Sequence, residues 1–143
     1  THHKDKAVLT LMKMDSVIET DFSTVTADMN LRQMVDTISR SNRNLFPVLD
    51  DKKHLIGVVL LDDIRNIMFR PDLYKRLHVS RFMTSANTKL HTSDSMEKVM
   101  KTFDDTGAWN LPVVDDNDCY VGFVSKSKIF NSYRRVLRHY SED

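Results

Sequence analysis

The side chains that most often act as catalysts or metal ligands are scattered through this sequence. The histidines are His2, His3, His54, His78, His91 and His139. Their spacing does not match a metal site, and no serine, histidine and acid form a recognisable nucleophile motif. The single cysteine, Cys119, is better explained as an inert, half-buried thiol than as a nucleophile. We therefore expect a protein that is not an enzyme and has no metal cofactor.

The charges nearly cancel, because the 143 residues include 21 lysines and arginines and 20 aspartates and glutamates. Such a chain has no strong field to concentrate nucleic acid, so we expect no nucleic-acid partner. A basic run near the C-terminus consists of Arg134, Arg135, Arg138 and His139, and it shares its segment with Phe130, Tyr133, Val136 and Leu137. The simplest interpretation is the polar face of an amphipathic helix, and contact with a membrane surface is the alternative.

The longest apolar run, residues 55–61, is far shorter than the roughly 20 residues that a membrane-spanning helix needs. The polar opening of the chain also lacks the pattern of a signal peptide. We expect no direct membrane insertion by this segment. Because the sequence starts at Thr1 rather than at a methionine, it indicates a fragment of a longer protein.

The elements that must position any site come in two copies. When the sequence is shifted by 65 residues, residues 46–51 (FPVLDD) fall on residues 111–116 (LPVVDD). The match continues without a gap: Gly57 falls on Gly122, Val59 on Val124, Ile64 on Ile129 and Asn66 on Asn131. A repeat of this kind predicts two copies of one structural unit.

Two apolar stripes at helical spacing predict a helix in each repeat. The stripes consist of Met29, Leu31, Met34, Val35 and Ile38 in the first repeat and Met96, Val99, Met100 and Phe103 in the second. Asp28 is a plausible N-cap of the first helix, and Asp94, with Glu97 three residues later, of the second. Asn42 and Gly107, at equivalent positions, tolerate left-handed geometry and are expected to follow the helix ends.

Each stripe is followed by two short apolar runs with an acidic segment between them, a pattern typical of β-hairpins. The predicted strands are residues 45–49 and 54–61, then 111–114 and 120–124, with turns at residues 50–53 and 115–118. A second helix is expected over residues 62–69, before Pro71, and over about residues 127–140. A short strand is expected near residues 24–26 in the first repeat and near residues 89–91 in the second. The predicted order of elements in each repeat is then strand, helix, strand, strand, helix.

One such repeat cannot cover both faces of its strands, since it has only two helices in about 55 residues. We therefore expect an α+β fold in which two pseudo-symmetric repeats pack as one module. Residues 1–13 are a lead-in segment, residues 14–78 the first repeat with its connector, and residues 79–143 the second repeat with a C-terminal helix.

The paired pattern of a hydrophobic-Pro-Val strand, an acidic hairpin and a glycine that leads into a helix resembles a tandem cystathionine β-synthase (CBS) domain pair. The resemblance covers residues 14 to about 140. Shorter strings are similar to the cytoplasmic tail of bacterial ClC-type chloride channels and proton-coupled chloride antiporters. These strings are residues 60–65, 68–69, 73–74 and 122–130.

This resemblance implies a non-catalytic regulatory module on the cytoplasmic side of the cell membrane. Its expected partners are the transmembrane part of the same transporter and a second copy, which would form a homodimer. The apolar residues expected at the contact are Ile64, Ile67 and Met68 with Ile129, Phe130 and Tyr133. The alternative is a ligand-sensing CBS pair of another transporter, a soluble protein or an enzyme.

In the CBS family the crevice between repeats can hold an adenine nucleotide such as ATP or AMP. A hydroxyl three residues after the glycine then binds phosphate, and an aspartate six residues after it binds ribose. The first repeat has the acid, Asp63, but Leu60 replaces the hydroxyl, whereas the second has Ser125 but Lys128 replaces the acid. Each half of the site is therefore incomplete.

Two interpretations remain open for three of these residues, Asp63, Trp109 and Lys128. Asp63 could hold ribose or simply favour the start of a helix through the helix dipole. Trp109, with Asn110, could stack on adenine or pack between the repeats, and Lys128 could pair with phosphate or remain a solvated surface lysine. The resulting prediction is at most one weakly bound nucleotide, held by Asp63 with Trp109 and Asn110 near it.

Overall fold

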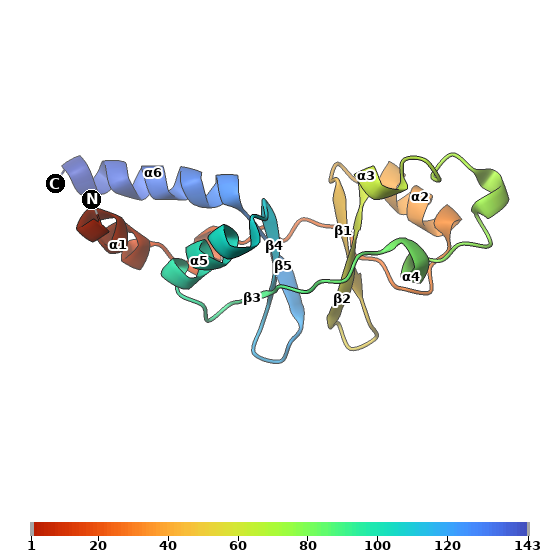
Figure 1. The fold of residues 1–143 in the computed structure, drawn as a ribbon, viewed down its shortest axis with the longest axis horizontal. Helices are drawn as coiled ribbons and strands as arrows, with labels where there is room; N and C mark the ends of the chain where they lie inside the picture. The colour runs from red at the N-terminus through yellow and green to blue at the C-terminus, as the bar shows by residue number, and fades with distance from the viewer. Residues whose placement is uncertain (1, 143) are drawn as a thin grey trace. The chain divides into compact units, whose positions relative to one another are not determined.

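The computed structural model describes residues 2–142 and the side chains of residues 6–139 (Figure 1). It confirms a mixed α+β fold built from two repeats. The chain forms two compact units, described here one at a time. Unit 1 contains the residues up to Thr20, residues 88–117 and the residues from Val121 onward, and unit 2 contains residues 21–87 and 118–120. The lead-in segment and the first residues of the first repeat, up to Thr20, therefore fold with most of the second repeat, and residues 79–87 fold with the first.

Unit 2 is built on an antiparallel pair of strands, β1 (Leu45–Leu49) and β2 (Leu55–Leu60), joined by the predicted acidic hairpin. Lys53 closes this hairpin with a φ of 70°. The helices are α2 (Leu31–Ser39), α3 (Leu61–Ile64) and α4 (Val79–Phe82), and a 3-10 turn, η2, spans Pro71–Leu73. Single bridging residues extend the pair on both edges, since Val25 lies parallel to Val48 and Thr84 antiparallel to Val58.

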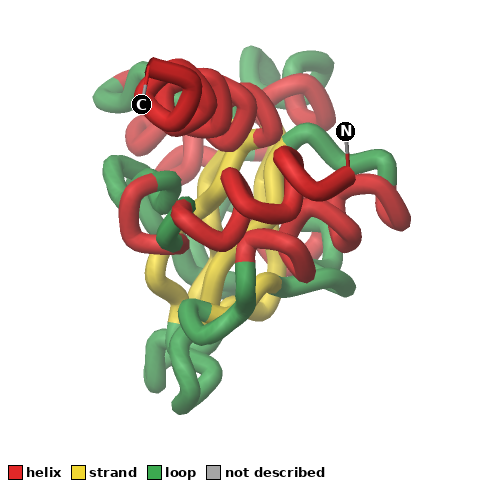
Figure 2. Tube along the Cα trace, turned by 90° about the vertical axis from the view of Figure 1, so that its left-hand side faces the viewer, coloured by secondary structure: helices red, strands yellow, loops and turns green. Residues whose placement is uncertain are grey.

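Unit 1 repeats this plan with the strand order β3 (Leu90–His91), β4 (Asn110–Val114), β5 (Tyr120–Ser125). Strand β3 is parallel to β4, and Glu19 bridges to Phe123 on the other edge. The helices are α1 (His2–Leu11), α5 (Met96–Thr106) and α6 (Lys126–Glu142), with a 3-10 turn η1 at Met14–Ser16. Helix α1 contacts both α5 and α6, and all three lie on one side of the sheet (Figures 1 and 2).

Each unit has its own apolar core. The core of unit 2 consists of Val25, Met34, Phe46, Val48, Val59, Ile64 and Val79. The core of unit 1 includes Val8, Met14, Val17, Leu90, Val99, Phe103, Val113, Val124 and Ile129. Both predicted helical stripes supply residues to these cores, which confirms the helices, and burial of this kind is the main force that stabilises each unit.

The two repeated glycines have a common physical reason. A β-carbon on Gly57 would lie 2.8 Å from the carbonyl oxygen of Thr84, and one on Gly122 would collide with the carbonyl oxygen of Glu19. At both places the edge segment is hydrogen-bonded across the glycine, with Val58 N to Thr84 O at 2.9 Å and Phe123 N to Glu19 O at 2.9 Å. Only glycine permits so close an approach of two backbones.

The helix caps differ from the sequence predictions. Asn30, not Asp28, caps α2, because its side chain accepts from Gln33 N while the Gln33 side chain accepts from Asn30 N. Ser95, not Asp94, caps α5 by accepting from Lys98 N at 3.1 Å.

The predicted left-handed helix ends were half right. Gly107 has the expected left-handed geometry, with a φ of 68°. Helix α2 instead ends at Arg40, whose φ is −103°. Among the described residues a positive φ occurs at Lys53, Gly107 and Asp118, so the prediction for Asn42 was wrong.

Two further elements differ from expectation, and the lead-in segment has a structure that the sequence did not predict. The second helix of the first repeat, predicted over residues 62–69, is regular only over Leu61–Ile64 and continues as turns. Tyr74 Oη donates to the carbonyl oxygen of Met68 at 3.0 Å, so that this acceptor has a partner outside a helical ladder. The strand expected at residues 24–26 is reduced to the bridge at Val25, whereas residues 89–91 contain β3. The lead-in forms α1, anchored by the buried Val8 and Met12.

Candidate functional site

In unit 2, the candidate site residues follow the end of β2. Leu60 is the N-cap residue of α3, and its side chain makes no capping hydrogen bond. The backbone N–H of Leu61 donates to Asn44 O at 2.8 Å. The fully buried Ile64 anchors this single turn in the core, which leaves Asp63 in the first turn with an exposed side chain. The Asp63 carboxylate is therefore accessible to ligand hydroxyl groups, and it also lies where a helix dipole favours negative charge.

In unit 1, the equivalent position is the start of α6. Ser125 Oγ accepts from Lys128 N at 3.0 Å, so the hydroxyl caps the helix. Lys126 N donates to Trp109 O at 2.9 Å, and Lys126 Nζ lies 5.5 Å from the centre of the Trp109 ring. These two contacts place the Trp109 backbone and ring beside the N-terminus of α6.

The exposed groups at this corner of unit 1 combine an aromatic surface with positive charge. The Trp109 side chain is 72% exposed. Asn110 and Lys128 are also exposed, at the first residue of β4 and in the first turn of α6. An exposed indole with the Lys126 ammonium group beside it can stack on a base, and the exposed Lys128 in the same helical turn adds positive charge that can attract phosphate.

The structure thus brings four of the five predicted site residues to one corner of unit 1, namely Trp109, Asn110, Ser125 and Lys128. Asp63 belongs to unit 2. The Ser125 hydroxyl has a structural role that the sequence did not predict, since it accepts a backbone hydrogen bond at the helix start. Lys128 remains exposed, as in its surface reading.

The groups with shifted pKa values lie elsewhere. In the β1–β2 hairpin, desolvation opposes ionisation of Asp50, but hydrogen bonds from the His54 and Lys52 backbones outweigh it and lower the pKa of its carboxyl. In the connector between the repeats, residues 70–77, the hydrogen bond from Arg70 lowers the pKa of Asp72. Burial raises the pKa of Tyr120 above its usual range, so its phenol is neutral. These shifts belong to turns and packing.

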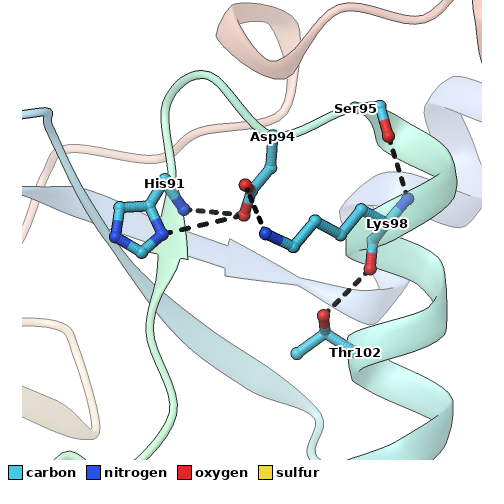
Figure 3. Close-up of polar contacts among 5 residues, drawn as sticks. All are labelled: His91, Asp94, Ser95, Lys98 and Thr102. Carbon is cyan, nitrogen blue, oxygen red and sulfur yellow. Dashed lines mark hydrogen bonds and ion pairs between the residues drawn. The ribbon is translucent and has the colours of Figure 1, made fainter.

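A polar cluster that the sequence did not identify lies before α5 (Figure 3). The Asp94 side chain, only 8% exposed, accepts from His91 N at 2.9 Å and from Lys98 Nζ at 3.1 Å. Thr102 Oγ1 in turn donates to Lys98 O at 2.9 Å. The i,i+4 spacing of Asp94 and Lys98 is the sequence signal that could have indicated this pair.

Further exclusions come from the described part of the chain. Among the side chains of residues 6–139, no group of three or more from His, Cys, Asp or Glu could hold a metal ion. No helix within residues 2–142 is both long and apolar enough to span a bilayer. Cys119 is half-buried, as predicted, and its Sγ lies 3.6 Å from Lys52 O.

Comparison with known proteins gives a clear family match. The model of the CBS domain matches residues 14–70 and again residues 79–135. A solved structure of CbpB in complex with c-di-AMP has a TM-score of 0.76 at 14% identity, and covers 98% of this chain and 96% of that one. The cytosolic domain of the Mg²⁺ channel MgtE in complex with ATP has a TM-score of 0.69 at 22% identity, over 83% of this chain and 48% of that one. At these identities the structures show a shared fold.

A curated relative is a homoserine O-acetyltransferase of Methanococcus vannielii, 21% identical over 119 residues. The match covers 83% of this chain but 24% of that protein. A second homoserine O-acetyltransferase, of Methanosphaera stadtmanae, is 22% identical over 115 residues and is covered to 23% of its length. The chain therefore spans about a quarter of the length of the curated relatives it matches.

Proposed function

Because this chain belongs to the CBS domain family, with one CBS domain in each of its two repeats, we propose that it is a regulatory module that itself catalyses no reaction. The observation that carries this proposal is the doubled fold, in which equivalent backbone contacts recur 65 residues apart: Val25–Val48 with Leu90–Val113, and Thr84–Val58 with Glu19–Phe123. Such a module acts by responding to a ligand and changing the state of the protein that carries it.

We propose further that the ligand is an adenine nucleotide, bound weakly and at most once per chain. The solved relatives described with ATP and with c-di-AMP both have adenine-containing ligands. In unit 2 Asp63 is the exposed carboxylate that we propose for ribose. In unit 1 the Trp109 ring with Lys126 beside it, together with the exposed Lys128, offers a stacking surface and positive charge. The Ser125 hydroxyl already caps α6, which limits what it can give to a phosphate.

The module is proposed to be the tail of a ClC-type chloride channel or antiporter, on the cytoplasmic side of the membrane and in contact with the transmembrane part of that transporter. The support is the similarity of residues 60–65, 68–69, 73–74 and 122–130 to such tails. The function of the tail would be to bias the transport gate without lining the ion pathway. Typical couplings of this kind are about 1–3 kcal/mol.

The other candidates are the CBS pair of an enzyme or of a different transporter. The homoserine O-acetyltransferase relatives favour the first of these, and the MgtE domain the second. The chain segment that adjoins this module in the full-length protein separates them. A series of hydrophobic helices would support a transporter, and a catalytic domain would support an enzyme.

A homodimer is proposed on the apolar surface of unit 1, around the expected contact residues Ile129, Phe130 and Tyr133. Ile64, also expected at the contact, is fully buried in the core of unit 2 and cannot contribute to it. A groove of about 450 Å³ on the unit 1 surface is lined by Leu9, Met100, Asp104, Ile129, Phe130 and Tyr133. The Phe130 side chain is 54% exposed although it is large and apolar, which is unfavourable unless a partner covers it. Sedimentation should show a dimer that Phe130→Asp dissociates. Only monomer at about 100 μM would mean that the isolated module lacks the roughly 1,200 Å² interface of a stable dimer.

The experiment that tests the regulatory proposal is deletion of residues 14–140 from the full-length transporter, followed by flux measurements in reconstituted vesicles. The proposal expects a changed rate or open probability and an unchanged anion selectivity. Altered selectivity would mean that the module lines the pathway. Unchanged gating under every nucleotide condition would reduce it to an assembly element.

A further inference from the structure

Each unit has a cleft between the residues that precede its first long helix and a segment that is distant in the sequence. In unit 2 the cleft has a volume of about 580 Å³. We call it the basic cleft, and its lining residues are Ala27, Asp28, Arg76, Leu77, His78, Ser80 and Arg81. In unit 1 the corresponding cleft, of about 390 Å³, lies between α1 and the start of α5 and includes Lys13, Asp15, Asp94 and Glu97.

The two clefts differ in charge although they occupy equivalent places in the repeat. The basic cleft has two guanidinium groups, from Arg76 and Arg81, together with the His78 imidazole and the Ser80 hydroxyl. In chain order, the residues at these positions are Arg76, His78, Ser80 and Arg81. The 65-residue shift places Leu11, Lys13, Asp15 and Ser16, in the same order, at the equivalent positions of unit 1. With Asp94 and Glu97 from the start of α5, the lining of the unit 1 cleft has three carboxylates and one ammonium group.

The acids near the basic cleft already have partners. Asp28 lines the cleft, and its Oδ1 accepts from Thr26 Oγ1 at 2.6 Å. Asp72, the acid of the connector, pairs with Arg70 at 2.8 Å, and the positive charge of Arg76 also helps to lower the pKa of Asp72. The side chains of Arg76, His78 and Arg81 are exposed to solvent.

The backbone around the basic cleft is held in place by hydrogen bonds. Val79 N donates to Met29 O at 2.8 Å and Ser80 N to Ala27 O at 3.0 Å, which joins the two sides of the cleft. Leu31 N donates to Leu77 O at 2.8 Å, and the Val79 side chain is fully buried. The charged side chains therefore project from a fixed frame, which reduces the entropy lost on binding.

We propose that the basic cleft binds a phosphate group, carried either by a soluble phosphate compound or by a lipid headgroup. Guanidinium groups match phosphate oxygens in a bidentate geometry, and an imidazole and a hydroxyl add further donors. This site includes none of the residues proposed to bind the nucleotide, so its test does not depend on whether a nucleotide binds.

The test uses inorganic pyrophosphate as the probe, with backbone amide shifts of the whole chain followed by NMR. Saturable shifts are expected at residues 27–28 and 76–81. The double variant Arg76→Gln/Arg81→Gln should weaken binding about tenfold or more, since each arginine contributes a charge-assisted contact. Lys13→Gln, at the position equivalent to His78, should leave pyrophosphate binding unchanged.

A second arm distinguishes the sources of the phosphate. Flotation with vesicles of phosphatidic acid in phosphatidylcholine, lost in the double variant, would assign the site to a lipid headgroup. Retained pyrophosphate binding without flotation would assign it to a soluble phosphate compound. Both outcomes support the site. Equal shifts in the two clefts, shifts spread over all basic surfaces, or unchanged affinity in a double variant with a native amide spectrum would overturn it.

Discussion

The two units share their backbone plan and differ in the side chains around it. Gly57 and Gly122 both lie under a crossing edge segment, and Lys53 and Asp118 both adopt left-handed geometry in a hairpin. The helix starts, in contrast, have Leu60 and Asp63 in unit 2 but Ser125 and Lys128 in unit 1. The basic cleft of unit 2 and the cleft between α1 and α5 in unit 1 also differ in charge.

This difference separates the constraints of folding from those of ligand binding. A glycine under a crossing strand cannot be replaced without moving backbone, so the repeated sequence has it twice. An exposed side chain at a helix start is free of that constraint. The comparison therefore predicts that equivalent changes in the shared plan have similar effects in both units, whereas equivalent changes at the exposed sites do not.

The largest effects are expected in the two cores. Phe46 and Phe103 are both fully buried, so Phe46→Ala and Phe103→Ala should each lower the free energy of unfolding by about 3–5 kcal/mol. Urea denaturation measures both. Phe69→Ala is the control, because that side chain is 79% exposed. A loss of less than about 1 kcal/mol in either core variant would contradict the idea that each unit depends on its own core.

The next effect sharpens the comparison of the two glycines. Gly122→Ala should cost about 3 kcal/mol, because the new β-carbon meets the Glu19 carbonyl oxygen, which belongs to backbone. Gly57→Ala should cost about 2 kcal/mol, because the approach to Thr84 O is less severe and the Met83 side chain can move. The reverse order in urea denaturation would contradict the idea that the distance to the crossing backbone sets the cost of each substitution.

Gly107→Ala is the matched control for this pair. A β-carbon there meets no atom within 4 Å, so only the φ of 68° is unfavourable to alanine. The expected loss is about 1 kcal/mol. A loss as large as that of Gly122→Ala would contradict the expectation that close approach to backbone costs more than a left-handed φ.

Smaller losses are expected at the two helix caps. Asn30→Ala and Ser95→Ala should each lower stability by about 1 kcal/mol, since both remove a side-chain acceptor for a backbone N–H. Asp28→Ala, which removes the acid at the cap position predicted from the sequence, should cost about half of that or less. Thermal unfolding of the three variants decides whether Asn30 or Asp28 begins α2.

The smallest effect concerns pH. The pKa of Asp50 is lowered in the folded state, so its ionised form stabilises the fold above the unfolded pKa of 3.8, and this stability is lost as pH falls through the lower folded pKa. Asp50→Asn should therefore make stability less dependent on pH below about 4. Asp116→Asn, at the tip of the other hairpin, controls for the loss of one negative charge. Equal slopes in wild type and Asp50→Asn would contradict this prediction.

Much of the fold could be predicted from the sequence, because the signals are local and occur twice. The hairpins, the buried stripes and the left-handed Gly107 all follow from short patterns that the structure reproduces. The caps could have been found in the same way. The 65-residue shift places Asn30 on Ser95, so that both repeats have a capping side chain at the same position. It places Asp28 on Ser93 and not on Asp94, the other predicted cap.

The remaining features depend on contacts between segments that are distant in the sequence. The edge bridge of Glu19 to Phe123 draws the N-terminal segment into unit 1, and no local pattern near Glu19 indicates this. The turns after α3 likewise include a contact with the later Tyr74, whose hydroxyl donates to the Met68 carbonyl oxygen. At the candidate site, the capping role of Ser125 was missed because a hydroxyl near a helix start can serve either backbone or ligand.

The most direct test of the inequality between the two units is calorimetric titration with AMP and ATP, with adenosine as the control for the phosphate. The account predicts at most one nucleotide per chain. It also predicts that Asp63→Ala weakens binding by about 10- to 150-fold, the effect of losing a charge-assisted hydrogen bond of about 1.5–3 kcal/mol. Asp62→Ala, which removes the neighbouring carboxylate paired with Arg65 at 2.8 Å, should leave the affinity unchanged. Two equivalent sites per chain, or binding that survives Asp63→Ala unchanged, would contradict the account, and no binding to the wild type would remove the nucleotide from it.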